Sequence, residues 1–257
     1  NTGLHLYDVT DPTSPQPIRT LSTTDLGGVI AGPLYAVGNL LIVTTPKDFG
    51  GIATLDISDP RAPTLLDAEV PHIDSYIGAF YGRHAYLVSP FRTYDVTTDP
   101  SDIRLLESTT TPPTEYVTFA EGYAFVGSMR PNSGIFKYEL LPDGGIREET
   151  FVTGRRDGHD FLVAFIDDQF TIPIGNLLVI SDDEVDIGTV LGIHQARPDT
   201  TPPEVAYVNP VDGTARLPVT SSVGVSLTDQ IDLGTVTPET LIVREVGTED
   251  ALTGTYG

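Results

Sequence analysis

Short apolar runs bounded by turn residues dominate the hydrophobic pattern of this chain, and amphipathic helical segments are almost missing. No long stretch keeps apolar residues at i, i+3, i+4 and i+7 without an interrupting glycine or proline. The 25 glycines and 21 prolines fit a protein with many turns. The pattern therefore predicts an all-β fold. The expected strands lie at 40–43, 52–57, 85–88, 92–96, 123–126, 135–138, 177–180 and 189–193.

One phrase recurs along the first half of the chain. It reads LYDVTDP at 6–12, TLDISDP at 54–60 and TYDVTTDP at 93–100, so that Asp8, Asp56 and Asp95 are 48 and 39 residues apart. Further apolar strands follow the later copies, at 64–66 and 103–106. A repeat of about 40 to 50 residues with four strands is typical of a β-propeller blade. Blades bury their faces only against neighbouring blades, so we expect them to be stacked.

The aspartates of this phrase have a local explanation. Asp side chains accept hydrogen bonds from backbone N–H groups two residues on, and proline presets a turn dihedral while lacking an N–H. Asp11-Pro12, Asp59-Pro60 and Asp99-Pro100 are therefore predicted to end one strand and reverse the chain. We interpret the recurring aspartates as turn formers and not as metal ligands.

The repeated form YLV…YDVTDPxxP is similar to the LVIVD repeat of bacterial and archaeal surface proteins, a family expected to form β-propellers. The resemblance covers roughly residues 1–196, or about four and a half blades. It is good in the second and third copies. The copy at 123–141 replaces the Asp-Pro turn with Leu141-Pro142-Asp143-Gly144-Gly145, and the copy around 176–195 is the most divergent. The first phrase would be the third strand of its blade, so we expect an incomplete or split propeller.

A second domain is expected after the polar, proline-rich linker 197–203. Residues 204–257 predict strands at 205–208, 223–227 and 240–243, with a turn at 209–213. The form PPxVxxxxPxDG…IDxxTVTxxT resembles the bacterial Ig-like domains of large exported proteins. That resemblance implies a β-sandwich spacer. Such domains run to about 100 residues, so we expect this one to be partial and the chain to be a piece of a larger protein.

The charge balance narrows the classes of partner. Asp and Glu number 36 against 14 Lys and Arg, which gives a net charge of −22. A surface this acidic repels nucleic acid and anionic membranes. No apolar run reaches the roughly 18 residues of a membrane helix, so direct membrane insertion is not expected. The absence of cysteine excludes thiolate metal sites, disulfides and thiol catalysis.

Acidic residues gather near the end of the repeat region. Possible calcium ligands are Asp167, Asp168, Asp182, Asp183, Glu184 and Asp186, and further binding candidates are Arg155, Arg156, His159 and Asp160. Carboxylates in loops can hold Ca²⁺, but the spacing of an EF-hand is missing. A calcium site, a solvated acidic loop and pairing with the two arginines stay open. We expect weak calcium binding or none, and no other cofactor.

Catalytic motifs such as G-x-S-x-G, a Walker loop or H-E-x-x-H are absent. The five histidines are far apart and are interpreted as surface or turn residues: His5, His72, His84, His159 and His194. We therefore expect a non-catalytic extracellular or cell-surface module of a larger bacterial protein. The propeller face would bind protein or glycan beside other domains of the same parent chain, and the Ig-like domain would be a spacer. The alternatives are a surface-layer or filament subunit, and a propeller hydrolase acting near His159 and Asp160.

Overall fold

Strands make up nearly all of the regular structure in the computed structural model of the chain. The structure describes residues 3–46, 50–71, 77–110, 114–128, 135–151, 153–156, 159–162, 169–174, 177–182, 190–193, 200–218, 221–229, 231–252 and 254. Within these ranges the one helix is a 3-10 turn, η1 (Leu233–Thr235). The predicted all-β class is confirmed. Nowhere in the described part of the chain is there a helix with the length and hydropathy needed to span a bilayer.

Three sheets are four-stranded antiparallel meanders, in which strands that follow one another in the chain pair side by side. The first meander contains β3 (Leu34–Val37), β4 (Leu40–Thr44), β5 (Ile52–Asp56) and β6 (Thr64–Glu69). The second contains β7 (Gly78–Tyr81), β8 (His84–Leu87), β9 (Arg92–Asp95) and β10 (Arg104–Ser108). The third contains β11 (Thr114–Ala120), β12 (Tyr123–Ser128), β13 (Ile135–Leu140) and β14 (Ile146–Phe151).

The remaining strands form two hairpins and one larger sheet. The hairpins are β1 (Leu4–Asp8) with β2 (Gln16–Leu21), and β20 (Val205–Asn209) with β21 (Gly224–Leu227). A five-stranded sheet has the order β16-β15-β19-β18-β17. Its strands are β15 (Thr153–Arg156), β16 (His159–Leu162), β17 (Gln169–Ile174), β18 (Leu177–Asp182) and β19 (Val190–Ile193). The strands β17, β18 and β19 pair in meander order. The place of a fourth meander strand beside β19 is taken by β15, which comes before all three in the chain.

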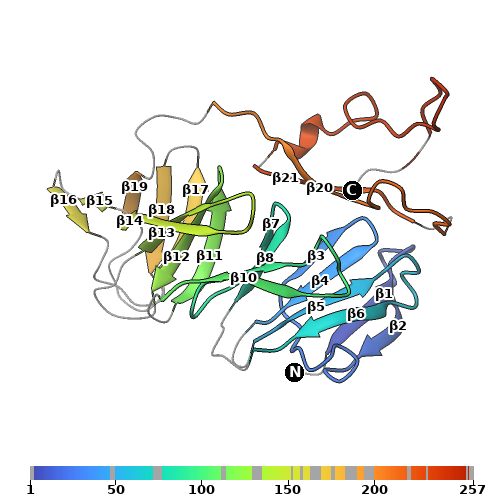
Figure 1. Ribbon diagram of the computed structural model, residues 1–257, viewed down its shortest axis with the longest axis horizontal. Coiled ribbons are helices and arrows are strands. Elements are labelled where there is room, and N and C mark those ends of the chain that lie inside the picture. The colour runs from blue at the N-terminus through green and yellow to red at the C-terminus, as the bar shows by residue number, and fades with distance from the viewer. Residues whose placement is uncertain are drawn as a thin grey trace.

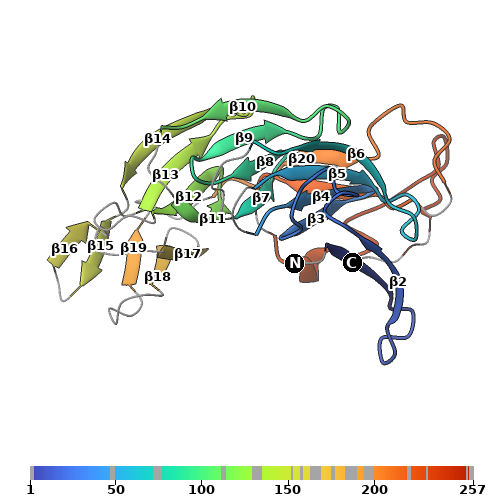
Figure 2. The same cartoon turned by 90° about the horizontal axis from the view of Figure 1, so that it is seen from below.

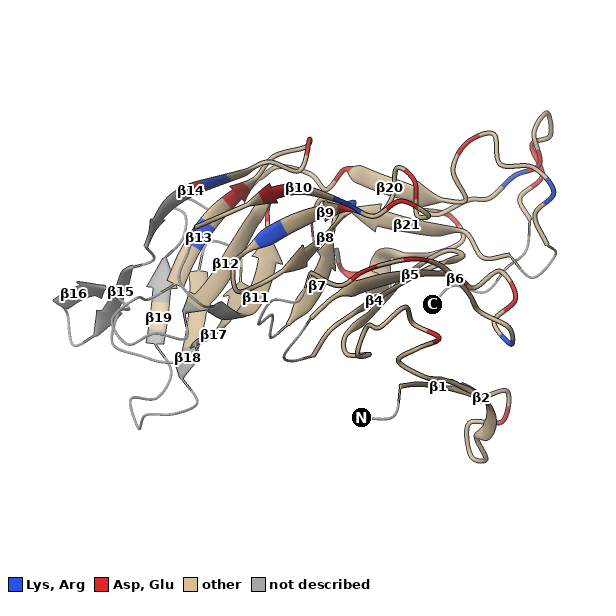
Figure 3. Ribbon diagram, turned by 60° about the horizontal axis from the view of Figure 1, so that its bottom comes forward, with Lys and Arg blue, Asp and Glu red and all other residues tan. Residues whose placement is uncertain are grey.

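The sheets lie side by side in an arc (Figures 1 and 2). The first strands β3, β7, β11 and β17 run along its inner side, and the fourth strands β6, β10 and β14 lie on its outer side (Figure 2). Acidic residues outnumber basic ones on the described turns and outer strands (Figure 3). The strands are consistent with a propeller-like all-β fold, and among the described residues no sheet closes on itself.

The core consists of layers between neighbouring sheets, and central strands contribute to two layers at once. Leu87 of β8 packs between the first and second meanders, whereas its neighbour Tyr86 packs between the second and third. In the same way, Ile42 of β4 packs toward the second meander, whereas its neighbour Val43 packs toward the first hairpin and the segment that follows it. Successive strand residues point to opposite faces, so a strand covered on both faces must be apolar at nearly every position. This explains the continuous apolar runs in the sequence.

An aromatic series connects the second and third meanders. The ring of Phe91 stacks on Tyr86, with centroids 5.6 Å apart, and on Tyr138 at 5.1 Å. Phe119 of β11 stacks on Tyr81 of β7 at 4.9 Å. Aromatic pairs at such distances add stabilisation beyond the burial of their surface. These two sheets are therefore held together chiefly by side-chain packing.

One predicted strand is wrong. Residues 240–243 form no strand, because Thr240 belongs to a turn that begins before Pro238. Its backbone N–H donates to the carbonyl of Thr237 (3.0 Å), and its hydroxyl donates to the carbonyl of Thr235 (2.7 Å). Backbone groups used inside a turn are not available to a sheet. The nearest β interaction is an isolated bridge between Arg244 and Ala251.

Candidate binding surface on the inner side of the sheet array

The recurring Asp-Pro phrase forms two side-chain-capped turns in each copy. In the first copy, the Asp8 carboxylate accepts from Thr10 N–H at 2.9 Å and the Asp11 carboxylate accepts from Thr13 N–H at 3.0 Å. The corresponding pairs are Asp56–Ser58 and Asp59–Arg61 in the second copy, and Asp95–Thr97 and Asp99–Ser101 in the third. The predicted turn role is confirmed. The hydrogen bonds also explain why the pKa of Asp8 and that of Asp11 are lowered.

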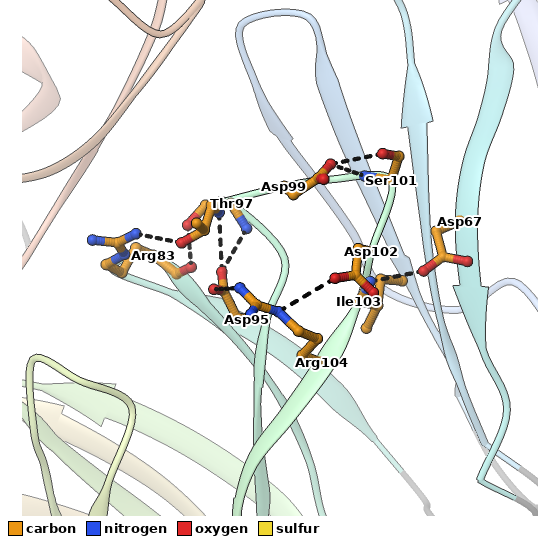
Figure 4. A network of polar contacts seen from close by, with 10 residues as sticks. Asp67, Arg83, Asp95, Thr97, Asp99, Ser101, Asp102, Ile103 and Arg104 are labelled. Carbon is orange, nitrogen blue, oxygen red and sulfur yellow. Dashed lines mark hydrogen bonds and ion pairs between the residues drawn. The ribbon is translucent and has the colours of Figure 1, made fainter.

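The same turns bind the first and second meanders to the sheet that precedes each of them. The guanidinium of Arg61 donates to the Asp8 carboxylate. The Thr54 hydroxyl donates to the carbonyl of Pro100 at 2.6 Å. The N–H of Ile103 donates to the Asp67 carboxylate at 2.7 Å, as Figure 4 shows. The repeated phrase therefore acts as a clasp between neighbouring sheets, which gives its recurrence a structural cause.

Around Asp95 the clasp becomes a polar network (Figure 4). Burial by itself would raise the pKa of Asp95, but hydrogen bonds from Thr98 and Thr97 and the charge of Arg104 lower it on balance. The Arg104 guanidinium lies 3.2 Å from the Asp95 carboxylate and 3.6 Å from that of Asp102. Asp95 and Asp99 accept from N–H groups of the turn, and Asp67 accepts from the N–H of Ile103, so these carboxylates have structural partners.

Replacing Asp67 with alanine is expected to lower the free energy of unfolding by about 1–3 kcal/mol, because the half-buried N–H of Ile103 would lose its acceptor. Urea denaturation followed by circular dichroism measures the change. Asp102→Ala is the matched control: it removes the same charge from a side chain that is 64% exposed, and should cost less than about 0.5 kcal/mol. Equal losses in both variants would show that charge, and not the clasp, is responsible.

His84 differs from its predicted surface or turn role. The residue is 6% exposed in β8. Burial lowers its pKa, the charge of Arg83 lowers it further, and Asp95 and Asp143 oppose that change. The neutral imidazole is therefore favoured in the folded protein. The prediction assigned this residue to a turn because Gly82 lies two residues before it. In the structure the strand β8 begins at His84 itself.

A groove of about 440 Å³ lies on the inner side of the array. We call it the inner groove. Its lining comes from β7, β11, β17 and the end of β21: Phe80, Tyr81, Gly82, Thr118, Phe119, Thr171, Ile172, Pro173, Ser226, Leu227 and Asp229. The first strands of three sheets and the second hairpin thus contribute to one surface. Most of its lining is apolar, with hydroxyl groups and one carboxylate.

Two neighbouring strands are tied together at the base of this groove. The hydroxyl oxygens of Thr118 on β11 and Thr171 on β17 are 2.6 Å apart and hydrogen-bonded. Thr171 is buried, whereas Ile172 beside it is 59% exposed and Ile174 is 60% exposed. Large apolar side chains left this exposed on neighbouring positions mark interaction surfaces. Ile172 therefore presents an apolar side chain to the inner groove, and Ile174 extends the apolar surface of β17 beyond the lining.

The Tyr81 hydroxyl closes one end of the inner groove. It donates to the carbonyl of Thr228 and accepts from the N–H of Gly122 at 3.3 Å. Burial raises the pKa of Tyr81, and the charges of Asp229 and Glu121 raise it further. The phenol therefore stays protonated and serves as a structural link between three elements.

The second hairpin is packed against the first meander. The N–H of Asn39 donates to the side-chain oxygen of Asn209 at 2.8 Å, and the N–H of Ser222 donates to that of Asn39 at 2.9 Å. Tyr207 is 8% exposed and belongs to the same core cluster as Leu40. Residues 200–203 carry no strand. The segment after the expected linker is thus joined to the sheets by core packing.

The candidate residues that the sequence suggested fall mainly elsewhere. The register of β15 and β16 places Arg155 opposite Asp160 and Arg156 opposite His159, and Asp182 ends β18. The other acids, Asp167, Asp168, Asp183, Glu184 and Asp186, lie outside the described residues, as do His72 and His194. In the ranges that the structure covers, no three His, Asp or Glu side chains gather as a metal site would require. The inner groove itself was not predicted.

Comparison with known protein families gives a match at the end of the chain. Residues 199–257 match the family model described as a bacterial Ig-like domain. The expected resemblance to LVIVD repeats is not confirmed by a family match, and a search of curated proteins found no match for the chain. Bacterial Ig-like domains are typical spacers of extracellular or surface proteins. The last quarter of the chain is therefore similar to such a spacer, and it follows an all-β region of small antiparallel sheets.

Proposed function

We propose that this chain is a non-catalytic extracellular or cell-surface module of a larger bacterial protein. In this proposal residues 1–196 form propeller-type blades whose inner groove binds a protein ligand, and the Ig-like residues act as the spacer. The match of residues 199–257 to a bacterial Ig-like domain supports the surface location. The clasps support a rigid platform, because they fix the second meander on the first through backbone groups.

The observation that carries the binding role is the apolar edge of β17. Ile172 is 59% exposed in the lining where three first strands meet, and Ile174, two residues further along β17, is 60% exposed. A protein segment with apolar side chains would bury this surface at about 25 cal/mol per Å². Asp229 in the lining favours a segment that also carries a cationic side chain.

A glycan fits the inner groove less well. Carbohydrate sites use an aromatic ring whose face is open to the sugar, but here Tyr81 and Phe119 stack on each other with their planes 6° apart. The chain also contains no tryptophan. One of the Thr118 and Thr171 hydroxyls donates to the other, so only one of these two hydroxyl protons is left to donate to a sugar. These contacts favour protein over glycan as the ligand class.

Peptides selected from a random displayed library on the full chain are expected to bind at the inner groove. Ile172→Asp should weaken their affinity by about tenfold or more, because it places a charge on the apolar edge. Isothermal titration measures the affinity. Leu233→Asp is the control, since it makes the same change at a side chain that is 78% exposed and outside the groove lining.

Three outcomes would contradict the proposal. The first is equal binding by both variants, which would place the ligand elsewhere. The second is selective binding on a glycan array with no peptide binder. The third is turnover of a peptide, glycan or phosphoester that Asp160→Ala abolishes, since this would favour the hydrolase alternative near His159 and Asp160 over a binding module.

A further inference from the structure

The first aspartate of the repeated phrase takes an arginine in the first and the third copy. Asp8 is paired with the guanidinium of Arg61, which comes from the following copy of the phrase. Asp95 is paired with Arg104, which lies opposite it on the neighbouring strand β10, at 3.2 Å. Asp56 of the second copy is half-buried and forms no ion pair with any residue that the structure describes. The same carboxylate therefore has a cationic partner in the two flanking copies and not in the middle one.

Two differences between the copies explain why Asp56 is left without an arginine. The position of Arg61 is taken by Ser101 in the next copy, since both residues donate their N–H to the second aspartate of their own phrase. The hydroxyl of Ser101 also donates to that aspartate, at 2.7 Å. The position of Arg104 is taken by Thr64, which lies opposite Asp56 in the register of β5 and β6. Neither side chain carries a charge, so the sequence itself removes both cations from the second copy.

A pocket of about 370 Å³, which we call the Asp56 pocket, lies at this carboxylate. It corresponds to a pocket of about 550 Å³ at Asp8. Each is lined by the phrase aspartate, the hydroxyl residue two positions on and the proline of the following copy: Asp8, Thr10 and Pro60 in one, and Asp56, Ser58 and Pro100 in the other. Arg61 belongs to the lining of the pocket at Asp8. The repeat has thus built the same pocket twice, and in one of them an arginine of the chain takes part.

The Asp56 pocket has further walls from the Ig-like segment, because Val211, Leu217 and Pro218 also line it. Apolar side chains suit the methylene stem of a long basic residue, and a carboxylate suits its charged end. The volume falls within the range of about 300 to 1,000 Å³ that is usual for ligand sites. Arg216 also lines the pocket, but its side chain is exposed, so solvent and salt weaken its repulsion of an entering cation.

We propose that the Asp56 pocket binds an arginine side chain of a partner polypeptide. The pair of Asp8 and Arg61 shows the contact that this carboxylate makes when an arginine is present. Charge-assisted hydrogen bonds between guanidinium and carboxylate are among the strongest that side chains form. The net charge of −22 also attracts cationic partners over a longer range. The Asp56 pocket and the inner groove have no lining residue in common, so this site is separate from the one proposed above.

The probe is a synthetic pentapeptide, acetylated and amidated at its ends, with one central arginine among glycines. Titrated into the isotopically labelled full chain, it should shift the backbone amide resonance of Ser58, which donates to Asp56 at 2.8 Å, until the shift saturates. The amide of Thr10, which donates to Asp8, should not respond, because Arg61 is already paired with that carboxylate. The same peptide with citrulline in place of arginine is the control. It keeps the shape and loses the charge, so its affinity should be lower by about tenfold or more.

Exchanging the residues at the arginine position tests the comparison between the copies directly. Ser101→Arg should supply the cation from within the chain and lower the affinity for the probe by about tenfold or more, whereas Ser101→Ala should leave it unchanged. The reverse change, Arg61→Ser, should make the amide of Thr10 respond to the probe. Asp56→Asn should weaken binding by about tenfold, while Asp59→Asn, which removes the same charge from the neighbouring exposed turn, should not.

Four outcomes would overturn the proposal. They are equal affinity for the arginine and citrulline peptides, unchanged binding by Ser101→Arg, no response of the Ser58 amide to the probe, and equal weakening by Asp56→Asn and Asp59→Asn. The last of these would mean that the probe adheres to the acidic surface in general. Ile172→Asp should leave the titration unchanged, because Ile172 lines only the inner groove. The two proposals therefore fail independently.

Discussion

Replacing Phe91 with alanine is expected to lower the free energy of unfolding by about 3–5 kcal/mol. Phe91 is fully buried, and its ring stacks on Tyr86 of the second meander and on Tyr138 of the third. The substitution leaves a cavity between two sheets that are joined mainly by side-chain packing. Strand backbones on both sides are fixed by their own ladders, so they cannot collapse into the space. Urea denaturation followed by far-ultraviolet circular dichroism measures the loss.

The control for this prediction is Leu105→Ala in β10, where the side chain is 52% exposed. That variant should stay within about 0.5 kcal/mol of the unmodified chain, because little packing is removed. If the free energy of unfolding of Phe91→Ala lies within about 1 kcal/mol of that of the unmodified chain, the prediction is contradicted, because the expected loss is at least about 3 kcal/mol. It would mean that contacts other than the aromatic series, such as the hydrogen bond from the Gly122 N–H to the Tyr81 hydroxyl, hold the second and third meanders together.

Central strands could be predicted from the sequence because each of them packs against two layers of the core, one on either face. A strand such as β4 or β8 is covered on both faces, so nearly every position is apolar and the run is visible without knowledge of the fold. The Asp-Pro turns were predictable for a local reason, since each carboxylate accepts from an N–H two residues away. The apolar run and the Asp-Pro turn each depend on only a few consecutive residues, so each can be recognised in a single sequence.

The inner groove lacks a local signal. Its lining comes from first strands that are covered less evenly than the central ones, and the exposed Ile172 and Ile174 look in sequence like any other strand residues. The groove itself depends on how three sheets and a hairpin meet. The strand β15 is a similar case, because it joins a sheet whose other meander strands come later in the chain. Non-local pairing of this kind leaves no pattern in a single sequence.

The docking of the second hairpin was also not predictable, and it rests on two glycines. A proline-rich linker suggested that the Ig-like segment would be separate from the sheets. In the structure neither glycine has room for a Cβ: one on Gly224 would meet the Gly38 backbone, and one on Gly38 would lie 2.3 Å from the carbonyl oxygen of Asn209. Gly38 also has a φ of +58°, as its turn between β3 and β4 requires. One residue type thus serves both a turn and an interface.

Replacing Gly224 with alanine is therefore expected to detach the second hairpin from the first meander. The new Cβ would lie 1.9 Å from the Gly38 nitrogen and 2.5 Å from the Val37 carbonyl carbon. Backbone atoms that belong to a strand and its turn cannot move aside at low cost. The hydrogen bonds that join Asn39 to Asn209 and to Ser222 should be lost together. Amide exchange at Asn39 and Ser222 should then accelerate by more than about tenfold.

Two further variants make this result specific. Gly254→Ala is the control, because no atom lies within 4 Å of the added Cβ, and it should leave exchange at both amides unchanged. Asn209→Ala removes an acceptor without a clash, so it should accelerate exchange at Asn39 only as far as the loss of about 0.5–1.5 kcal/mol allows. Retained protection in β8 would show that the sheets remain folded. Slow exchange at Asn39 and Ser222 in Gly224→Ala would instead mean that the hairpin is held by Tyr207 and its core contacts, and that the glycine contact is incidental to docking.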